Sequence, residues 1–123
     1  MTLDTNIIIA YLGGDPNVIA TLSYSRKIGK ALFLPTMVEP EILSFTGWDN
    51  EELRQTEKFL EENFTTIPFD RQLSRLTASI RRQNKMKLPD AIIAATAILT
   101  RTALVTRNER DFNKIRELQV LVI

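Results

Sequence analysis

Hydrophobic positions recur along the chain with two different periods, and the changes of period divide the sequence into helices and strands. Apolar residues at helical spacing predict helices over residues 5–12, 16–29, 37–45, 51–63, 71–84, 90–101 and 109–115. Short aliphatic runs between them predict strands over residues 1–3, 31–34, 65–69, 103–106 and 119–123. Because helices separate the strands, the pattern predicts an α/β fold: a central parallel sheet of four to five strands, flanked by helices on both faces.

Residues that favour helix starts stand before several of these helices. Asp15 and Pro16 supply an N-cap and a first-turn proline, and Asp70 caps the helix that follows it. Thr36 is the expected cap of the third helix. No repeat, low-complexity tract or linker interrupts the pattern, so residues 1–123 are expected to form one domain.

Composition narrows the class of protein. With 44% hydrophobic and 25% charged residues, the chain is typical of a soluble globular domain. Its formal net charge of +1 predicts no strong global attraction to polyanions, so any binding of nucleic acid must rely on local basic groups. The absence of cysteine fits a reducing compartment, and no apolar run predicts a membrane span or a signal peptide. We therefore expect a cytoplasmic protein that does not bind membranes.

The absence of histidine limits the chemistry further. It excludes nucleophilic catalysis of the Ser-His and Cys-His kinds. It also leaves only oxygen ligands for a metal ion, since cysteine is absent too. Carboxylates are therefore the first candidates for a functional site.

Three aspartates stand where a predicted strand meets the start of a helix: Asp4, Asp90 and Asp111. In open α/β sheets, ligands bind outside the carboxyl ends of the strands, so these side chains are expected to converge there. Clustered carboxylates repel one another and raise one another's pKa unless a cation holds them. Oxygen ligands suit Mg²⁺ or Mn²⁺.

Each of these acids also has an ordinary structural role open to it. Asp90 is a candidate helix cap, a role that stabilises a helix by about 1 kcal/mol. Asp4 fits an Asx-type turn, and Asp111 fits a first-turn acid that interacts with a helix dipole. The shared position at strand-to-helix junctions favours a common site.

Three blocks of sequence resemble the signature blocks of the PIN-domain nucleases, and in particular the VapC-type toxins of bacterial and archaeal toxin–antitoxin pairs. They are LDTNIIIAYL at residues 3–12, LPDAIIAATA at 88–97 and LVTRNERDF at 104–112. The resemblance spans nearly the whole chain in order and spacing. It implies a PIN-like three-layer fold and an endoribonuclease that depends on Mg²⁺ or Mn²⁺.

The resemblance also implies roles for individual residues. Asp4, Asp90 and Asp111 match the acids of the three blocks, as catalytic metal ligands. The supporting polar residues are Asn6 and Thr106, with Asn108 standing where many PIN proteins have an acid.

A fourth acid of the family is a glutamate on the helix after the second strand. Glu39 and Glu41 both lie there, about 200° apart around a helix, so only one of them can face the metal. Glu41 is followed by Ile42 and Leu43 and matches the family's glutamate-leucine spacing better. We therefore choose Glu41 as the fourth catalytic and metal-binding acid.

Basic residues near the blocks are candidates for contacts with RNA phosphates: Lys85, Lys87, Arg107 and Arg110. Arg81 and Arg82 lie near them, and these two also fit a solvated helix end favoured by the dipole.

The resemblance implies protein partners as well as RNA. VapC-type toxins form homodimers and are silenced by a small antitoxin, of the VapB type, whose tail occupies the active-site groove. Phe45, Trp48 and Phe59 are candidates for that groove or for a dimer face, and core packing is the alternative for each.

Other functions fit the acids less well. A receiver domain needs adjacent acids after its first strand, and a haloacid-dehalogenase-type phosphatase needs an aspartate at position 6, where this chain has asparagine. A non-catalytic PIN-fold module that binds RNA or protein remains as the alternative. Retention of all four acids favours the enzyme over that module.

Overall fold

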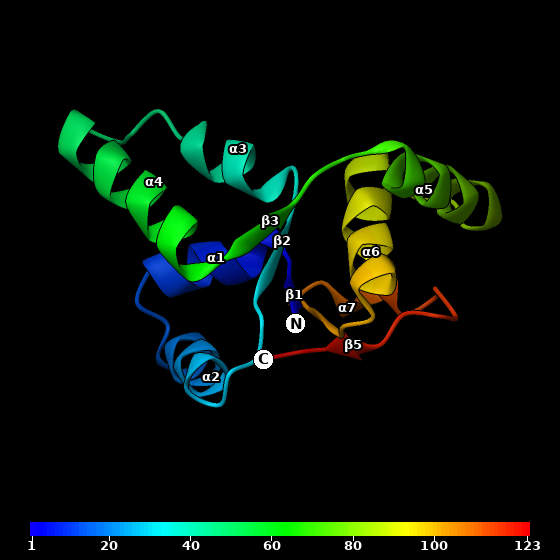
Figure 1. The fold of residues 1–123 in the computed structure, drawn as a ribbon, viewed down its shortest axis with the longest axis horizontal. Coiled ribbons are helices and arrows are strands. Elements are labelled where there is room, and N and C mark those ends of the chain that lie inside the picture. The colour runs from blue at the N-terminus through cyan, green and yellow to red at the C-terminus, as the bar shows by residue number, and fades with distance from the viewer.

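The computed structural model describes all 123 residues, arranged as a parallel sheet between two layers of helices (Figure 1). The strands are β1 (Thr2–Leu3), β2 (Phe33–Pro35), β3 (Thr65–Ile67), β4 (Leu104–Val105) and β5 (Val120–Leu121). The helices are α1 (Thr5–Leu12), α2 (Pro16–Lys27), α3 (Val38–Leu43), α4 (Asn50–Asn63), α5 (Arg71–Gln83), α6 (Leu88–Thr100) and α7 (Glu109–Phe112). The five strands are ordered β3-β2-β1-β4-β5, and every neighbouring pair is parallel. The predicted α/β fold with a sheet of four to five parallel strands is confirmed.

The two faces of the sheet bury two separate hydrophobic clusters, because successive residues of a strand point to opposite faces. In β4, Leu104 belongs to one cluster and Val105 to the other. The helices α1 to α4 cover the Val105 face, and α5, α6 and α7 cover the Leu104 face (Figure 1). The two helical layers form two lobes with the sheet between them.

Helix starts follow the capping residues of the sequence. Asp15 accepts hydrogen bonds from the backbone N–H groups of the first turn of α2, and Asp70 does the same for α5, as predicted. Asp49 and Glu52 form a reciprocal capping box at the start of α4. Gly14, between α1 and α2, has φ of +84°, a conformation that favours glycine.

Several boundaries of helices and strands differ from the sequence prediction. The third helix, α3, is shorter than expected at both ends, and Thr36 lies in a turn before it; Met37 is the N-cap and makes no side-chain capping bond. Most strands are also shorter than their apolar runs: the ladders of β1 extend over at most two residue pairs, and the ladder between β2 and β3 over three. Pro35 belongs to β2 as its last residue, where proline is tolerated.

No helix of the structure is both long enough and apolar enough to cross a membrane.

Candidate acidic site at the carboxyl end of the sheet

The register of two adjacent strands brings the first predicted site residues together. β1 and β4 are parallel, and Leu3 pairs with Val105 at their carboxyl ends. The next residues, Asp4 and Thr106, therefore leave the sheet side by side. The Asp4 N–H still donates to the carbonyl of Val105, at 3.0 Å, which fixes the backbone at this point.

Hydrogen bonds fix the orientation of the Asp4 carboxylate, which is only 7% exposed. Its Oδ1 accepts from the backbone N–H of Thr5 at 2.7 Å. Its Oδ2 accepts from the Thr106 hydroxyl at 2.7 Å and from the Asn6 amide at 3.3 Å. Because a carboxylate has about four acceptor positions, lone pairs remain on Asp4 for a cation.

A chain of hydrogen bonds connects Asp4 to Asp111. The buried Thr106 Oγ1 that donates to Asp4 also accepts from the Asn108 N–H at 2.9 Å. The Asn108 amide then donates to Asp111 Oδ2 at 2.6 Å. The structure thus places the three supporting residues of the sequence analysis, Asn6, Thr106 and Asn108, directly against two of the predicted acids.

Asp90 has a different environment, and the idea that it caps its helix is wrong. It is the third residue of α6, whose N-cap is Lys87, and no side-chain capping bond forms there. Burial raises the pKa of Asp90 above its ordinary value of 3.8, and the negative charges of Asp111, Asp4 and Glu41 raise it further; Lys87 acts in the opposite direction. The charges of the three other predicted acids therefore act on Asp90.

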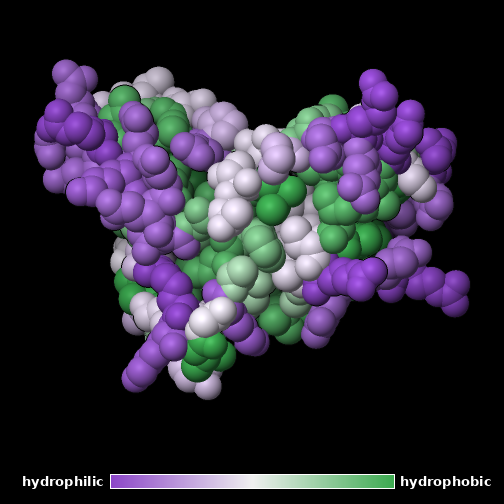
Figure 2. All heavy atoms as spheres, in the orientation of Figure 1, coloured by the Kyte–Doolittle hydropathy of each residue, from purple (hydrophilic) through white to green (hydrophobic).

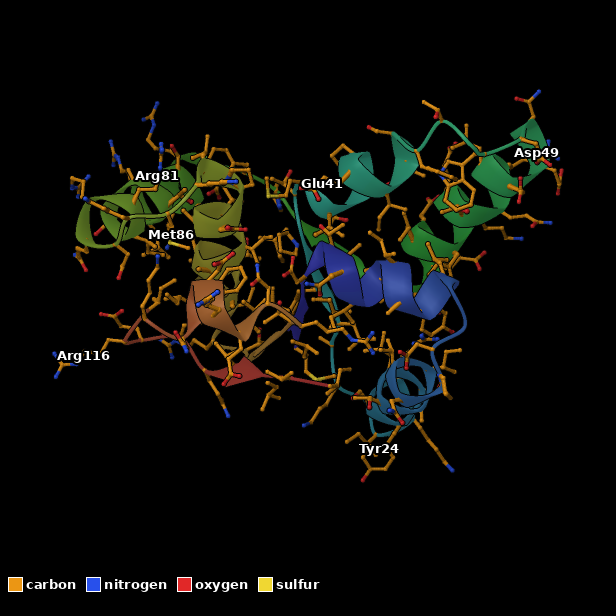
Figure 3. All side chains as sticks on the ribbon, turned by 180° about the vertical axis from the view of Figure 1, so that it is seen from behind. Tyr24, Glu41, Asp49, Arg81, Met86 and Arg116 are labelled. Carbon is orange, nitrogen blue, oxygen red and sulfur yellow. The ribbon has the colours of Figure 1, made fainter.

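Of the two glutamates on α3, Glu41 is the one whose charge acts on Asp90. Figure 3 shows Glu41 on the side of α3 that faces α6, across the gap between the lobes. Glu41 acts on the pKa of Asp90, whereas Glu39 on the same helix is not among the charges that do so. The choice of Glu41 over Glu39 thus agrees with the structure. We call Asp4, Glu41, Asp90 and Asp111 the acidic site.

The donor set of the acidic site fits a hard divalent cation. All candidate ligands are carboxylate oxygens, which Mg²⁺ and Mn²⁺ prefer. The four acids do not form a ready-made metal cage, because no three of them lie close enough to hold a metal ion by themselves. A cation at this place would complete its coordination shell with water or substrate oxygens, as Mg²⁺ usually does in proteins.

The candidate phosphate-binding residues divide into two groups. Lys87 lies close enough to Asp90 to lower its pKa, and Lys85 and Arg110 are exposed. Arg107 is different, because its guanidinium is occupied: Nη2 donates to Asp15 Oδ2 at 2.6 Å and Nε donates to the carbonyl of Ile123 at 3.0 Å. The predicted contact between Arg107 and RNA therefore has no support in its position.

A shallow basic depression lies on the lobe formed by α5 and α6. Its lining residues are Ala78, Arg81, Arg82, Lys85 and Met86, and its volume is about 540 Å³. Arg81 Nε donates to the carbonyl of Met86 at 3.3 Å, and Figure 3 shows these two residues close together. Figure 2 shows hydrophilic atoms over the outer parts of both lobes and a hollow between the lobes.

An apolar groove of about 530 Å³ lies on the opposite lobe, between α1 and the segment after α3. It is lined by Ile9, Leu12, Gly13, Glu41, Ile42, Ser44, Phe45 and Trp48. Ile9 and Phe45 are 58% and 61% exposed. The Phe45 ring packs edge-on against Trp48, whose indole N–H donates to the carbonyl of Ile42. Glu41 belongs both to this groove and to the acidic site, so the two are continuous.

Of the three aromatic residues proposed for a groove, only two line it. Phe59 packs instead against the hydrophobic cluster under α1, where its ring stacks on Tyr11 at 5.0 Å and meets Phe64 edge-on. The core alternative therefore holds for Phe59; Trp48 packs against the same cluster and also lines the groove, and Phe45 lines the groove.

Asp15 is the residue near the site that sequence reasoning missed. The sequence indicated its role as the cap of α2, but gave no sign that it pairs with Arg107, which is 92 residues away. Only the parallel register of β1 and β4 brings the two segments together.

Fold and site together define an α/β domain with an acidic site at the carboxyl edge of a parallel sheet. The chain belongs to the PIN domain family, whose model matches residues 1–118. The resemblance seen in the three sequence blocks is thereby confirmed.

Relatives and solved structures agree with this membership. The chain is 28% identical over 132 residues to ribonuclease VapC1 of Rickettsia felis and 29% identical to ribonuclease VapC of Rickettsia bellii, covering all of this chain and 96% of each relative. A toxin–antitoxin complex from Klebsiella pneumoniae contains a chain that is 28% identical, with a TM-score of 0.75, covering 98% of this chain and 94% of that one. The VapBC2 structure from Rickettsia felis, bound to a promoter DNA fragment, shares the fold with a TM-score of 0.84 at 18% identity, covering 99% and 97%.

Proposed function

We propose that this protein is a metal-dependent endoribonuclease and the toxin of a toxin–antitoxin pair. The observation that carries the proposal is the position of Asp90, a half-buried carboxylate whose pKa is raised first by its burial and then by the charges of Asp111, Asp4 and Glu41. Four acids gathered at the carboxyl edge of the sheet need a counter-charge. Membership of the PIN domain family and the ribonuclease names of the relatives support the same activity.

The residues have distinct roles in this proposal. Asp4, Glu41, Asp90 and Asp111 would hold Mg²⁺ or Mn²⁺, which lowers the pKa of a water molecule and stabilises charge on the leaving oxygen of an RNA phosphodiester. Thr106 and Asn6 keep the Asp4 carboxylate in one orientation, and Asn108 does the same for Asp111.

In this proposal, the exposed cations beside the acidic site contact the RNA backbone. Lys87 lies nearest to Asp90, and Lys85 and Arg110 flank it on the segments before α6 and within α7. Because the net charge of the chain is only +1, these local cations supply the attraction for phosphate groups. Action on cellular RNA places the protein in the cytoplasm.

The experiment that tests the nuclease is cleavage of a mixed-sequence RNA pool in the presence of Mn²⁺ or Mg²⁺. We expect metal-dependent products that EDTA abolishes. Asp4→Asn and Asp90→Asn should each lower the cleavage rate by more than about 100-fold, because loss of a ligand exceeds the effect of losing a supporting residue. Asp49→Asn is the matched control, since it changes an acid at the far end of α4 (Figure 3) to a residue that also caps helices.

One observation favours the alternative, a non-catalytic PIN-fold module that binds RNA or protein. No group of three acids lies close enough to hold a metal ion. The same cleavage assay separates the two functions: a parent protein that makes no metal-dependent products, and that behaves like Asp4→Asn, would establish the binding module.

The apolar groove is proposed to bind the cognate antitoxin, of the VapB type. Its exposed apolar residues, Ile9 and Phe45, fit the apolar side chains of a peptide segment, and Glu41 at its end fits a cation on that segment. The solved relatives include a toxin–antitoxin complex from Klebsiella pneumoniae and VapBC2 from Rickettsia felis. A homodimer is proposed as the assembly, with sedimentation equilibrium as its measurement.

Co-expression tests the toxin assignment. Cells that produce the intact protein alone should stop growing, and production of the antitoxin should restore growth. Phe45→Ser should weaken that rescue while leaving Mn²⁺-dependent cleavage in place, because Phe45 lines the groove and is not one of the four acids. Normal growth of cells that produce the intact protein alone would contradict the proposed toxin role. It would not contradict the proposed nuclease activity.

A further inference from the structure

Arg107 and Asp15 form the one ion pair that connects the segment after β4 to the layer of α1 and α2. The Arg107 Nη2 atom lies 2.6 Å from Asp15 Oδ2, and the side chains are 38% and 26% exposed. The remaining ion pairs of the structure join neighbouring turns of α4. This pair therefore links parts of the chain that no covalent or helical connection holds together.

Each residue of the pair makes a second contact: Asp15 caps α2, and the backbone of Arg107 contacts Asn6, which contacts Asp4. Asp15 uses its other oxygen, Oδ1, to cap α2, where it accepts from the N–H groups of Asn17 and Val18 at 3.0 and 3.2 Å. The backbone N–H of Arg107 donates to Asn6 Oδ1 at 3.3 Å. Asn6 in turn donates through Nδ2 to Asp4. A continuous path of contacts thus runs from the cap of α2 to the carboxylate of Asp4.

The orientation of the Asn6 amide depends on this path. An asparagine side chain has an acceptor on one side and a donor on the other, and a rotation of the amide exchanges them. The Arg107 N–H requires the oxygen of Asn6 to face it, so the NH₂ group must face Asp4 and Thr106. If the turn over residues 106–108 moved away, the Asn6 oxygen would lose this donor, and only the 3.3 Å bond to Asp4 would hold the amide in its orientation.

We propose that Asp15 and Arg107 are positioning residues, whose ion pair holds the turn over residues 106–108 so that Asn6 keeps its donor on Asp4. Only the kinetic test of this proposal rests on the proposed nuclease function. In this proposal Arg107 holds part of the protein in place, whereas the sequence analysis gave it as a candidate for contact with RNA phosphates. An exposed ion pair contributes little to the free energy of unfolding, so its effect should appear in the site and not in stability.

Four variants separate positioning from phosphate binding: Arg107→Gln, Asp15→Asn, the double variant, and Arg107→Lys. Asparagine at position 15 still caps α2, so only the ionic partner is lost. Lys58→Gln is the matched control, because Lys58 is an exposed cation paired with Glu62 on α4, away from the acidic site.

If the pair positions the site, Arg107→Gln and Asp15→Asn should each lower kcat about tenfold, since small displacements of catalytic groups cost one to two powers of ten. KM should change less, the double variant should be no slower than either single one, and Arg107→Lys should recover most of kcat. A phosphate-binding Arg107 would behave differently: Arg107→Gln would raise KM, and Asp15→Asn, which frees the guanidinium, would leave KM unchanged or lower it. That result would overturn the proposal.

A second measurement, by NMR, does not require enzyme activity and so tests the positioning role independently of the proposed nuclease function. The side-chain NH₂ resonances of Asn6 in a ¹⁵N-labelled protein should shift in Asp15→Asn and in Arg107→Gln, and should stay in place in Lys58→Gln. The backbone N–H of residue 107 should also exchange faster in Asp15→Asn. Unchanged Asn6 resonances in both variants would contradict the positioning role of Asp15 and Arg107, even if the protein cleaves RNA. If the parent protein has no nuclease activity, the proposed nuclease function is wrong. The Asn6 resonances would still test whether Asp15 and Arg107 position Asn6.

Discussion

At the scale of single residues, Thr106 is the side chain on which the acidic site depends most. It is fully buried, and its hydroxyl donates to Asp4 while it accepts from the Asn108 N–H and, at 3.5 Å, from the Asn6 amide. A hydroxyl has one donor and two acceptor positions, so all of its capacity is used. Its loss would remove one donor from the buried Asp4 carboxylate and would leave the Asn108 N–H without its partner.

Thr106→Val should therefore reduce the free energy of unfolding by about 1–3 kcal/mol, although the two side chains have the same shape, because unpaired buried groups carry their desolvation penalty. Chemical denaturation measures the change. Thr96→Val is the control: Thr96 is equally buried, but its hydroxyl bonds only the Ile92 carbonyl one turn earlier, so the loss should stay under about 1 kcal/mol. Equal losses at the two positions would contradict the role given to Thr106.

The charge on Asp90 makes a pH-dependent contribution to stability. Burial and the neighbouring acids raise its pKa in the folded protein above 3.8. The unfolded chain therefore ionises this group more readily, so the contribution is present at low pH and lost as pH rises through the raised pKa. Without metal, Asp90→Asn should become more stable than the parent as pH rises from 3 to 7, by less than about 1 kcal/mol because the group is half-exposed.

Asp15→Asn should show the opposite pH dependence and serves as the comparison. The hydrogen bond from Arg107 lowers the pKa of Asp15, so its contribution is present above 3.8 and is lost as pH falls through the lowered pKa. The parent should therefore gain stability over Asp15→Asn as pH rises. Urea denaturation in EDTA at several pH values measures both differences, and slopes of the same sign in the two variants would contradict both assignments.

At the scale of elements, α6 explains how a carboxylate reaches the centre of the site. The helix is buried along most of its length, and its small residues Ala91, Ala94, Ala95 and Ala97 are fully buried against α5 and the sheet. Small side chains allow close approach of neighbouring helices, so the helix has little freedom to shift. Asp90, in its first turn, is thereby held facing the carboxyl edge of the sheet.

Ala94→Leu tests this packing. A larger side chain at a fully buried position should reduce the free energy of unfolding by about 1–3 kcal/mol, since the core cannot expand without strain. Ala20→Leu is the matched control at an exposed position on α2, with an expected change within about 0.5 kcal/mol. Thermal denaturation of the two variants measures the difference, and an equal response would show that α6 is packed more loosely than its burial indicates.

The elements were predictable from sequence where local signals decide them. Asp15 and Asp70 cap helices in the structure as the sequence predicts, because capping depends on a residue and its own next turn. The limits of the strands were not predictable, since they depend on the length of the neighbouring strand. The three supporting residues came from the family resemblance, and the pairing of Asp15 with Arg107 came from neither source, because it depends on the register between β1 and β4.

At the scale of the whole molecule, the distribution of charge matters more than its sum. The net charge is only +1, yet Arg81, Arg82 and Lys85 lie together on the α5 lobe, and Lys87, two residues after Lys85, lies close enough to Asp90 to lower its pKa. The four acids and this cationic surface therefore adjoin. Such an arrangement holds a polyanion by its flanking phosphates while the acids, with a cation bound, face the bond to be cut.

The salt dependence of RNA binding tests this arrangement. Each phosphate contact to a single strand contributes about 0.7 to the slope of log K against log salt concentration, so Lys87→Gln should reduce that slope by about 0.7 and weaken binding to all sequences alike. Fluorescence anisotropy on an Asp4→Asn background, which avoids cleavage, measures the slope. Lys58→Gln removes the same charge from α4 and should leave it unchanged. Equal slopes for Lys87→Gln and its parent would mean that RNA approaches the acidic site from another side, because a cation that contacts no phosphate releases no counterion.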